Sequence, residues 1–153
     1  MNATTCLTAS RALVLITGNS SANSDLALKE DLLGIAVKII RLHMEAGDTC
    51  LYGCGLLGIL TEHNEEAKAA AIKLDAVKIC LDAMKKNLQN AVLCQFVCGV
   101  FLNLISLSPE RNAIVGKSGA IVTVMGAMKK SMDSQALLQF GVCVLANLAL
   151  NSK

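Results

Sequence analysis

Apolar segments and short polar breaks alternate along the last third of the chain, as in amphipathic helices. The breaks lie at 106–109, 118–119 and 131–134. The segment between the last two breaks carries apolar residues at the spacing i, i+3, i+4, i+7, namely Ile121, Val124, Met125 and Met128. This spacing places them on one face, and it predicts a helix over 120–130 with one buried stripe.

Residues that start and stop helices flank the same segments. Pro109 suits the first turn of a helix, because its missing N–H would have no partner there. Gly119 suits the position after a helix, since it adopts the left-handed conformation without a steric cost. Asp133 or Ser134 can cap the helix that follows. The sequence therefore predicts three helices in this part of the chain, over 110–117, 120–130 and 135–150.

This helical pattern recurs at a fixed offset of 44 residues, as from Gln95 to Gln139. LCQFVCGVFLNL at Leu93–Leu104 and LLQFGVCVLANL at Leu137–Leu148 share their Gln, Phe and Asn at this offset. One step earlier, the segment 50–55 repeats two cysteines, a glycine and an aromatic position without a gap. Self-similarity at this period predicts a helical solenoid, in which stacked units bury each other's apolar faces.

One row of positions in the long helices suggests a ligand-binding surface. The row is spaced at i, i+4, i+8 and comprises Gln139, Cys143 and Asn147, then Gln95, Gly99 and Asn103, then Leu51, Gly55 and Ile59. If the long helices stack side by side, these positions form a ladder on one face of the solenoid. Such a face is the natural place for an extended ligand.

Composition supports packed helices and narrows the choice of partners. Hydrophobic residues make up 54% of the 153 residues and there is one proline, so the chain is neither disordered nor collagen-like. The formal net charge is +2, and the largest basic clusters are the pairs at 85–86 and 129–130. Because phosphate binding needs several basic groups on one surface, we expect no nucleic-acid partner.

The segment 91–108 carries no charge and could be read as a membrane span. Gln95 and Asn103 within it, and Pro109 directly after it, favour a buried helix, so we expect no membrane association. The early apolar run at 12–16 is shorter than the apolar core of a signal peptide, about 7–15 residues. An odd count of seven cysteines without an export signal predicts a reducing compartment, the cytoplasm or the nucleus.

A short, a medium and a long helix within 44 residues resemble the armadillo repeat. The segments ERNAIVGKSGAI, GAIVTVMGAMKKS and LLQFGVCVLANLA carry this resemblance, which covers nearly the whole chain. It implies an all-α fold, a right-handed α-α superhelix of about three and a half repeats in one domain. The expected units are a partial repeat over 1–18 with the third helix only, predicted over 5–16, and repeats over 19–62, 63–106 and 107–153. HEAT repeats, with two helices per unit, are the alternative.

The resemblance also implies a function, the binding of an extended peptide or a partner protein in a concave groove lined by third helices. The family's third-helix Asn, which hydrogen-bonds the ligand backbone, is matched by Asn103 and Asn147. Nuclear-import adaptors of the family carry a Trp four residues before this Asn, where this chain has Gly99 and Cys143, so their lysine slots are missing here. An amide that caps local backbone is the alternative for both Asn residues. The expected partner-binding residues are Gln95, Asn103, Gln139, Asn147, Leu51 and Ile59.

Repeated cysteine pairs offer an alternative function. Cys50 with Cys54, and Cys94 with Cys98, are i, i+4 pairs, and four thiolates could bind zinc if adjacent helices brought both pairs together. Small buried hydrophobic residues are the simpler interpretation. No catalytic or phosphate-binding motif and no nucleophile with a base is found, so we expect a non-enzymatic protein without a cofactor.

The last unit keeps apolar residues where a capping repeat would carry polar ones. These residues are Leu138, Phe140, Val142, Val144, Leu145 and Leu148. Because a solenoid end exposes the face that a further unit would cover, we expect either a homodimer through an end face or a longer array.

Overall fold

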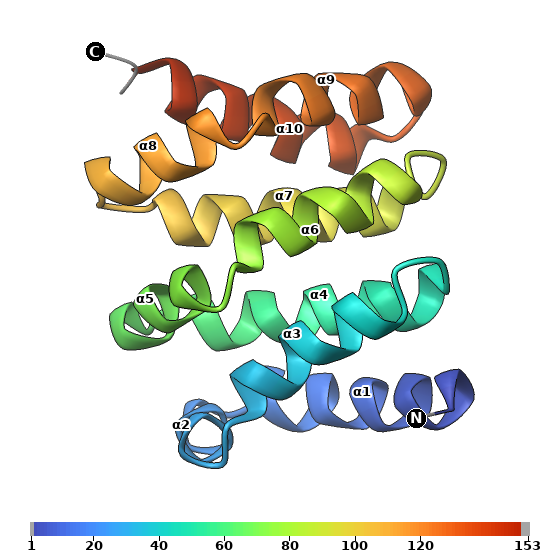
Figure 1. The fold of residues 1–153 in the computed structure, drawn as a ribbon, viewed down its shortest axis with the longest axis vertical. Helices are drawn as coiled ribbons and strands as arrows, with labels where there is room; N and C mark the ends of the chain where they lie inside the picture. Colours follow the sequence, from blue (N-terminus) through green and yellow to red (C-terminus); the bar gives the residue numbers. More distant parts are fainter. Residues whose placement is uncertain (1, 151–153) are drawn as a thin grey trace.

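The computed structural model describes residues 2–150, which form ten α-helices and no strand (Figure 1). The chain is therefore all-α over this range. The helices are α1 (Ala3–Gly18), α2 (Ser21–Lys29), α3 (Leu32–Leu42), α4 (Gly47–Thr61), α5 (Glu65–Lys73), α6 (Ala76–Lys86), α7 (Ala91–Ile105), α8 (Pro109–Lys117), α9 (Ala120–Lys130) and α10 (Gln135–Leu150). None of these helices combines the length and apolar character needed to cross a membrane.

Every helix begins 44 residues after its equivalent in the preceding unit. The long third helices α1, α4, α7 and α10 begin at Ala3, Gly47, Ala91 and Gln135. The first helices α2, α5 and α8 and the second helices α3, α6 and α9 follow the same period. The three helices predicted for the last unit are confirmed.

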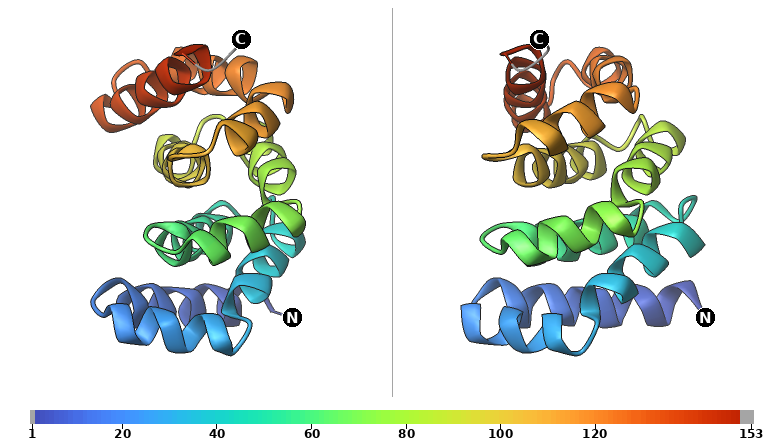
Figure 2. Two further views of the ribbon diagram at one scale, coloured as in Figure 1. Left: turned by 90° about the vertical axis from the view of Figure 1, so that its left-hand side faces the viewer. Right: turned by 60° about the vertical axis from the view of Figure 1, so that its left-hand side comes forward.

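The units stack so that equivalent helices are neighbours. The third helices α1, α4, α7 and α10 lie side by side in one layer, and the second helices α3, α6 and α9 lie in another (Figure 1). Figure 2 shows these layers from the side, with the units following one another from the N-terminus to the C-terminus. Thus α4 packs against α1 and α7, and α7 packs against α10.

Local signals repeat with the units and place the helix starts. The side chains of Ser20, Asn64 and Ser108 cap α2, α5 and α8, each accepting a hydrogen bond from a backbone N–H three residues later. The residue before each second helix is left-handed, at Asp31, Asp75 and Gly119. Gly119 has φ of 89°, so its predicted role at the end of α8 is confirmed.

The expectation of one buried stripe on α9 is wrong for two residues. Val124 is fully buried, but Ile121 and Met125 are 39% and 43% exposed. Their equivalents one unit earlier, Val77 and Leu81, are 5% and 2% exposed. The difference arises because no further unit packs on α9 and α10 within residues 2–150, so the end of the stack leaves these side chains uncovered.

Arg111 joins the second and third units at the turn between α7 and α8. Its Nε donates to the carbonyl oxygen of Leu104 at 2.5 Å, and its Nη2 donates to that of Ser106 at 3.0 Å. The same Nη2 lies 2.7 Å from Oε2 of Glu65, whose Oε1 accepts from Lys68 at 2.6 Å. These hydrogen bonds from Lys68 and Arg111 hold the pKa of Glu65 below its ordinary value.

Alanine substitutions at two glycines of α4 are expected to change the free energy of unfolding in opposite directions. A methyl group at Gly53 would lie 2.8 Å from Cγ1 of Ile40, whereas one at Gly58 would meet only Cγ2 of Val100 at 3.8 Å. Gly58→Ala is expected to raise the free energy of unfolding by about 0.5–1 kcal/mol, because alanine restricts the unfolded chain. Gly53→Ala is expected to lower it by about 1–2 kcal/mol through overpacking. Urea denaturation followed by circular dichroism measures both, and a stabilising Gly53→Ala would contradict the close packing of α3 on α4.

Candidate functional site

A hollow of about 260 Å³ crosses the third-helix layer between α4, α7 and α10. Residues from three successive units line it, which requires the stacking described above. Its lining includes Gly55, Gly58, Ile59, Glu62, Gln95, Phe96, Gly99, Asn103 and Phe140. A surface formed jointly by three units is a candidate site for a ligand that runs across the helices.

The structure brings three of the six expected partner-binding residues together. Ile59, Gln95 and Asn103 all line the hollow. The other three do not line it: Leu51 is half-buried on α4, and Gln139 and Asn147 are exposed on α10. Ile59, Gln95 and Asn103 therefore share one surface. Gln139 and Asn147 lie outside its lining, although Phe140 of the same helix is part of it.

The two Asn residues make internal hydrogen bonds. Nδ2 of Asn103 donates to the carbonyl oxygen of Gly58 at 2.9 Å, which ties α7 to α4. Nδ2 of Asn147 donates to the carbonyl oxygen of Cys143 at 2.8 Å, within α10. The bond of Asn147 agrees with the local-capping interpretation, whereas Asn103 binds the backbone of the neighbouring helix. Each bond uses part of the donor capacity of its amide.

Two aromatic residues, Phe96 and Phe140, line the hollow and were missed as part of the site. With Tyr52 they recur at the offset of 44, and in the sequence they served only as evidence of the repeat. Each ring lies against a residue 41 positions earlier, in the preceding unit. The three contacts are Tyr52 with Arg11, Phe96 with Gly55, and Phe140 with Gly99.

The distances show how closely these rings pack on the preceding helix. A methyl group at Gly55 would lie 3.3 Å from Cε1 of Phe96, and one at Gly99 would lie 3.7 Å from Cε1 of Phe140. Glycine therefore lets the ring of the next unit approach the helix backbone. Since Phe96 remains 38% exposed, its ring also forms part of the wall of the hollow.

A second hollow of about 250 Å³ adjoins the first along α4. It lies against α1 and α2, and it shares Ile59 and Glu62 with the first. Asp25 and Glu62 line it, and neither lining includes a lysine or an arginine. Glu62 directly follows the C-terminal end of α4, which carries partial negative charge, so the surface attracts cations.

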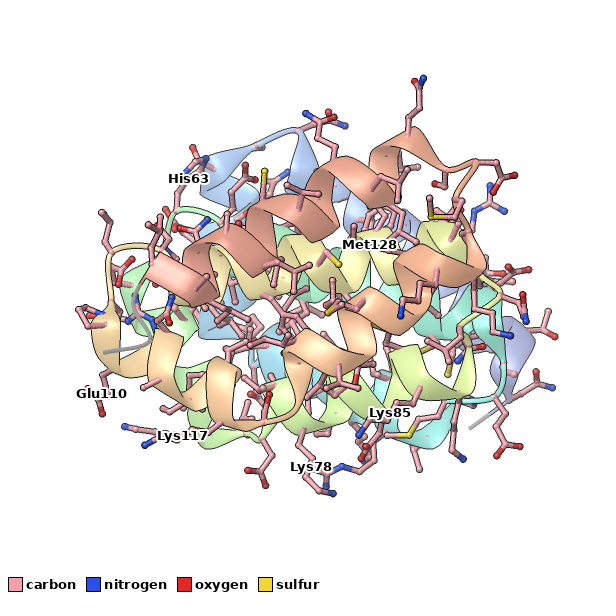
Figure 3. The ribbon with its side chains drawn as sticks, turned by 90° about the horizontal axis from the view of Figure 1, so that it is seen from above. His63, Lys78, Lys85, Glu110, Lys117 and Met128 are labelled. Carbon is pink, nitrogen blue, oxygen red and sulfur yellow. The ribbon has the colours of Figure 1, made fainter. Side chains whose placement is uncertain are left out.

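His63 also lines the second hollow, at the edge of the stack (Figure 3). Its Nε2 is 3.6 Å from Oε1 of Glu62, and both side chains are more than half exposed. An exposed pair of this kind contributes little to stability. The pair leaves the carboxylate accessible to a ligand, since Glu62 is still open to solvent.

The repeated cysteines are buried in the core. Cys50, Cys54, Cys94 and Cys98 are 0% exposed. Contacts with the thiols of Cys50 and Cys80 raise the pKa of Cys54, and burial raises the pKa of Cys94 to about 11 and that of Cys98 to about 12. Metal binding and nucleophilic attack need the thiolate, which the raised pKa values disfavour at Cys54, Cys94 and Cys98, whereas the hydrogen bond with Cys54 lowers the pKa of Cys50.

The zinc and thiol alternative gains no support from this arrangement. Within residues 2–150, no group of three or more His, Cys, Asp or Glu side chains is placed to hold a metal ion. Comparison of the chain with protein-family models, with curated proteins and with solved structures returns no match.

Proposed function

We propose that this protein is a non-enzymatic interaction module that binds an extended peptide segment of a partner protein on its third-helix face. The observation that carries the proposal is the hollow that crosses α4, α7 and α10. Equivalent positions of successive units build this hollow, such as Gly55 with Gly99 and Phe96 with Phe140. In this proposal the protein adopts an armadillo-like right-handed superhelix and acts in the cytoplasm or the nucleus.

The spacing of the third helices suits an extended ligand. Packed helices lie about 8–10 Å apart, and an extended chain advances about 3.3–3.6 Å per residue. A peptide that runs across the helices therefore meets a new helix about every third residue. On α7 it finds a polar and an apolar contact side by side, Gln95 and Phe96. The amides would hold the peptide backbone, and the apolar positions would select side chains.

A homodimer through the end face of α9 and α10 is a further part of this proposal. Ile121, Met125 and Val142 are 39%, 43% and 56% exposed there. Their equivalents in the preceding unit, Val77, Leu81 and Cys98, are buried. Burying this face against a second copy would remove apolar area from water and so favour a dimer. Light scattering at increasing protein concentration measures the molar mass and detects the dimer.

Peptide selection tests the proposed function. Peptides selected from a random displayed library on the wild-type protein should bind in the groove. We expect the Kd of a selected peptide, measured by fluorescence anisotropy, to rise about tenfold or more in the double variant Ile59→Ala with Gln95→Ala, a loss of about 1.4 kcal/mol.

A double variant on the opposite side is the matched control. Lys78 and Lys85 project from the second-helix edge of the stack (Figure 3), where their side chains are 77% and 53% exposed. Lys78→Ala with Lys85→Ala should leave the Kd unchanged. If this control weakens binding and the groove variant does not, the peptide binds on another face and the proposed function is wrong.

A further inference from the structure

We infer that the hollow accepts an arginine side chain of the bound peptide, with the guanidinium against the ring of Phe96 and its charge facing Glu62. The inference rests on the proposed function and specifies its ligand. Phe96 and Glu62 line the same hollow from neighbouring units, on α7 and at the end of α4. The occupant is therefore a peptide of stated chemistry, one with a cationic and planar side chain.

The chain itself contains the same pairing one unit earlier. Cζ of Arg11 on α1 lies 5.6 Å from the centroid of the Tyr52 ring on α4, within the distance of a cation–π contact, about 6 Å. Tyr52 is the equivalent of Phe96 at the offset of 44. The surface thus already holds a guanidinium against this aromatic position.

The next units carry glycine where the first carries arginine. Gly55 and Gly99 are the equivalents of Arg11, so no side chain of the chain itself extends over the ring at these positions. Phe96 contacts Gly55 on one side and is 38% exposed, and the hollow of about 260 Å³ lies in front of it. The side of the ring that faces Gly55 is packed against the helix, so a ligand side chain from the hollow can reach the part of the ring that stays exposed.

Charge complementarity selects a cation for this space. Glu62 lines both hollows and Asp25 lines the second, while neither lining holds a lysine or an arginine. The C-terminal end of α4 adds partial negative charge beside Glu62. Arginine suits the site better than lysine, because its planar and weakly hydrated guanidinium stacks on aromatic rings.

A nuclear magnetic resonance titration of the full chain tests the inference. The probe is the peptide acetyl-Gly-Ser-Arg-Ser-Gly-amide, and two otherwise identical peptides carry citrulline or leucine in place of arginine. We expect saturable shifts of the Gly55, Gly58 and Gly99 amide signals with the arginine peptide. The citrulline peptide, which has the same shape without the charge, should bind about three- to tenfold more weakly.

Two variants test whether Phe96 and Glu62 contact the arginine of the peptide. Phe96→Leu keeps an apolar side chain but removes the ring, and Glu62→Gln removes the charge; each should weaken the arginine peptide about threefold or more. Glu110→Gln is the matched control, since Glu110 is an exposed carboxylate on α8 outside both linings (Figure 3). It should leave the affinity unchanged.

The possible results separate the two proposals. If citrulline or leucine peptides shift the groove glycines as strongly as the arginine peptide, the arginine assignment is wrong and the groove function stands. The arginine assignment is also wrong if Phe96→Leu and Glu62→Gln leave the affinity of the arginine peptide unchanged. If no probe shifts these glycines, the arginine assignment is overturned, and the peptides selected from the library decide whether the groove function stands.

Discussion

Replacing Phe101 with alanine is expected to lower the free energy of unfolding by about 3–5 kcal/mol. Phe101 lies on α7, is 0% exposed and is among the largest fully buried side chains of residues 2–150. It belongs to the core that the stacked units share, so its removal leaves a cavity that the neighbouring helices cannot fill. Urea denaturation followed by circular dichroism measures the loss.

Equivalent residues in the neighbouring units provide the comparison. Leu57 and Leu145 occupy the position of Phe101 one unit earlier and one unit later. Leu57 is 0% exposed, so Leu57→Ala should cost about 2–5 kcal/mol. Leu145 is only half-buried, because no unit covers α10 within the described residues, and Leu145→Ala should cost less than about 1.5 kcal/mol. If both leucine variants lost the same free energy of unfolding, the conclusion that Leu57 lies in a covered unit and Leu145 in an uncovered one would be wrong.

Replacing Arg111 with alanine is expected to lower the free energy of unfolding by about 2–3 kcal/mol. The side chain is only 15% exposed, and it donates to the carbonyl oxygens of Leu104 and Ser106 at the end of α7. Most of the loss comes from these two charge-assisted hydrogen bonds in a partly buried turn. The contact with Glu65 adds little, because that carboxylate is 61% exposed.

Two further variants identify the origin of this loss. Arg111→Lys should recover less than half of this loss, because an ammonium group cannot donate to both carbonyl oxygens in the geometry of the guanidinium. Lys117→Ala, which removes a cation from the same helix away from the turn, should change stability by less than about 0.5 kcal/mol. Denaturation midpoints for the three variants separate these cases. An Arg111→Ala protein as stable as the wild type would mean that the turn does not depend on this side chain.

Local signals explain why the helices of the last unit were predictable. Pro109, Gly119 and Ser134 act on their own backbone neighbours, so their effect can be read without knowing the fold. The first helix was predicted over 5–16 and runs from Ala3 to Gly18. Its start was missed because Asn2 caps it within a polar stretch that gives no apolar periodicity.

The candidate site was less predictable, because it depends on how neighbouring helices are displaced along their axes. The offset of 44 identifies equivalent residues, whereas the contacts join residues 41 apart, such as Gly55 and Phe96. The sequence likewise shows that Ile121 and Met125 share an apolar face, but not whether a neighbour covers it. The hydrogen bond from Asn103 to Gly58 also requires knowledge of the packing.

The stacking of each long helix beside its equivalent is the basis for the site and for both proposals. A nuclear Overhauser spectrum tests it most directly, since the chain has few aromatic rings: three Phe, one Tyr and two His. We expect cross-peaks from the ring of Phe96 to the α protons of Gly55, and from the ring of Phe140 to those of Gly99. If both rings lack these cross-peaks in a folded and helical sample, the third helices do not stack in this register.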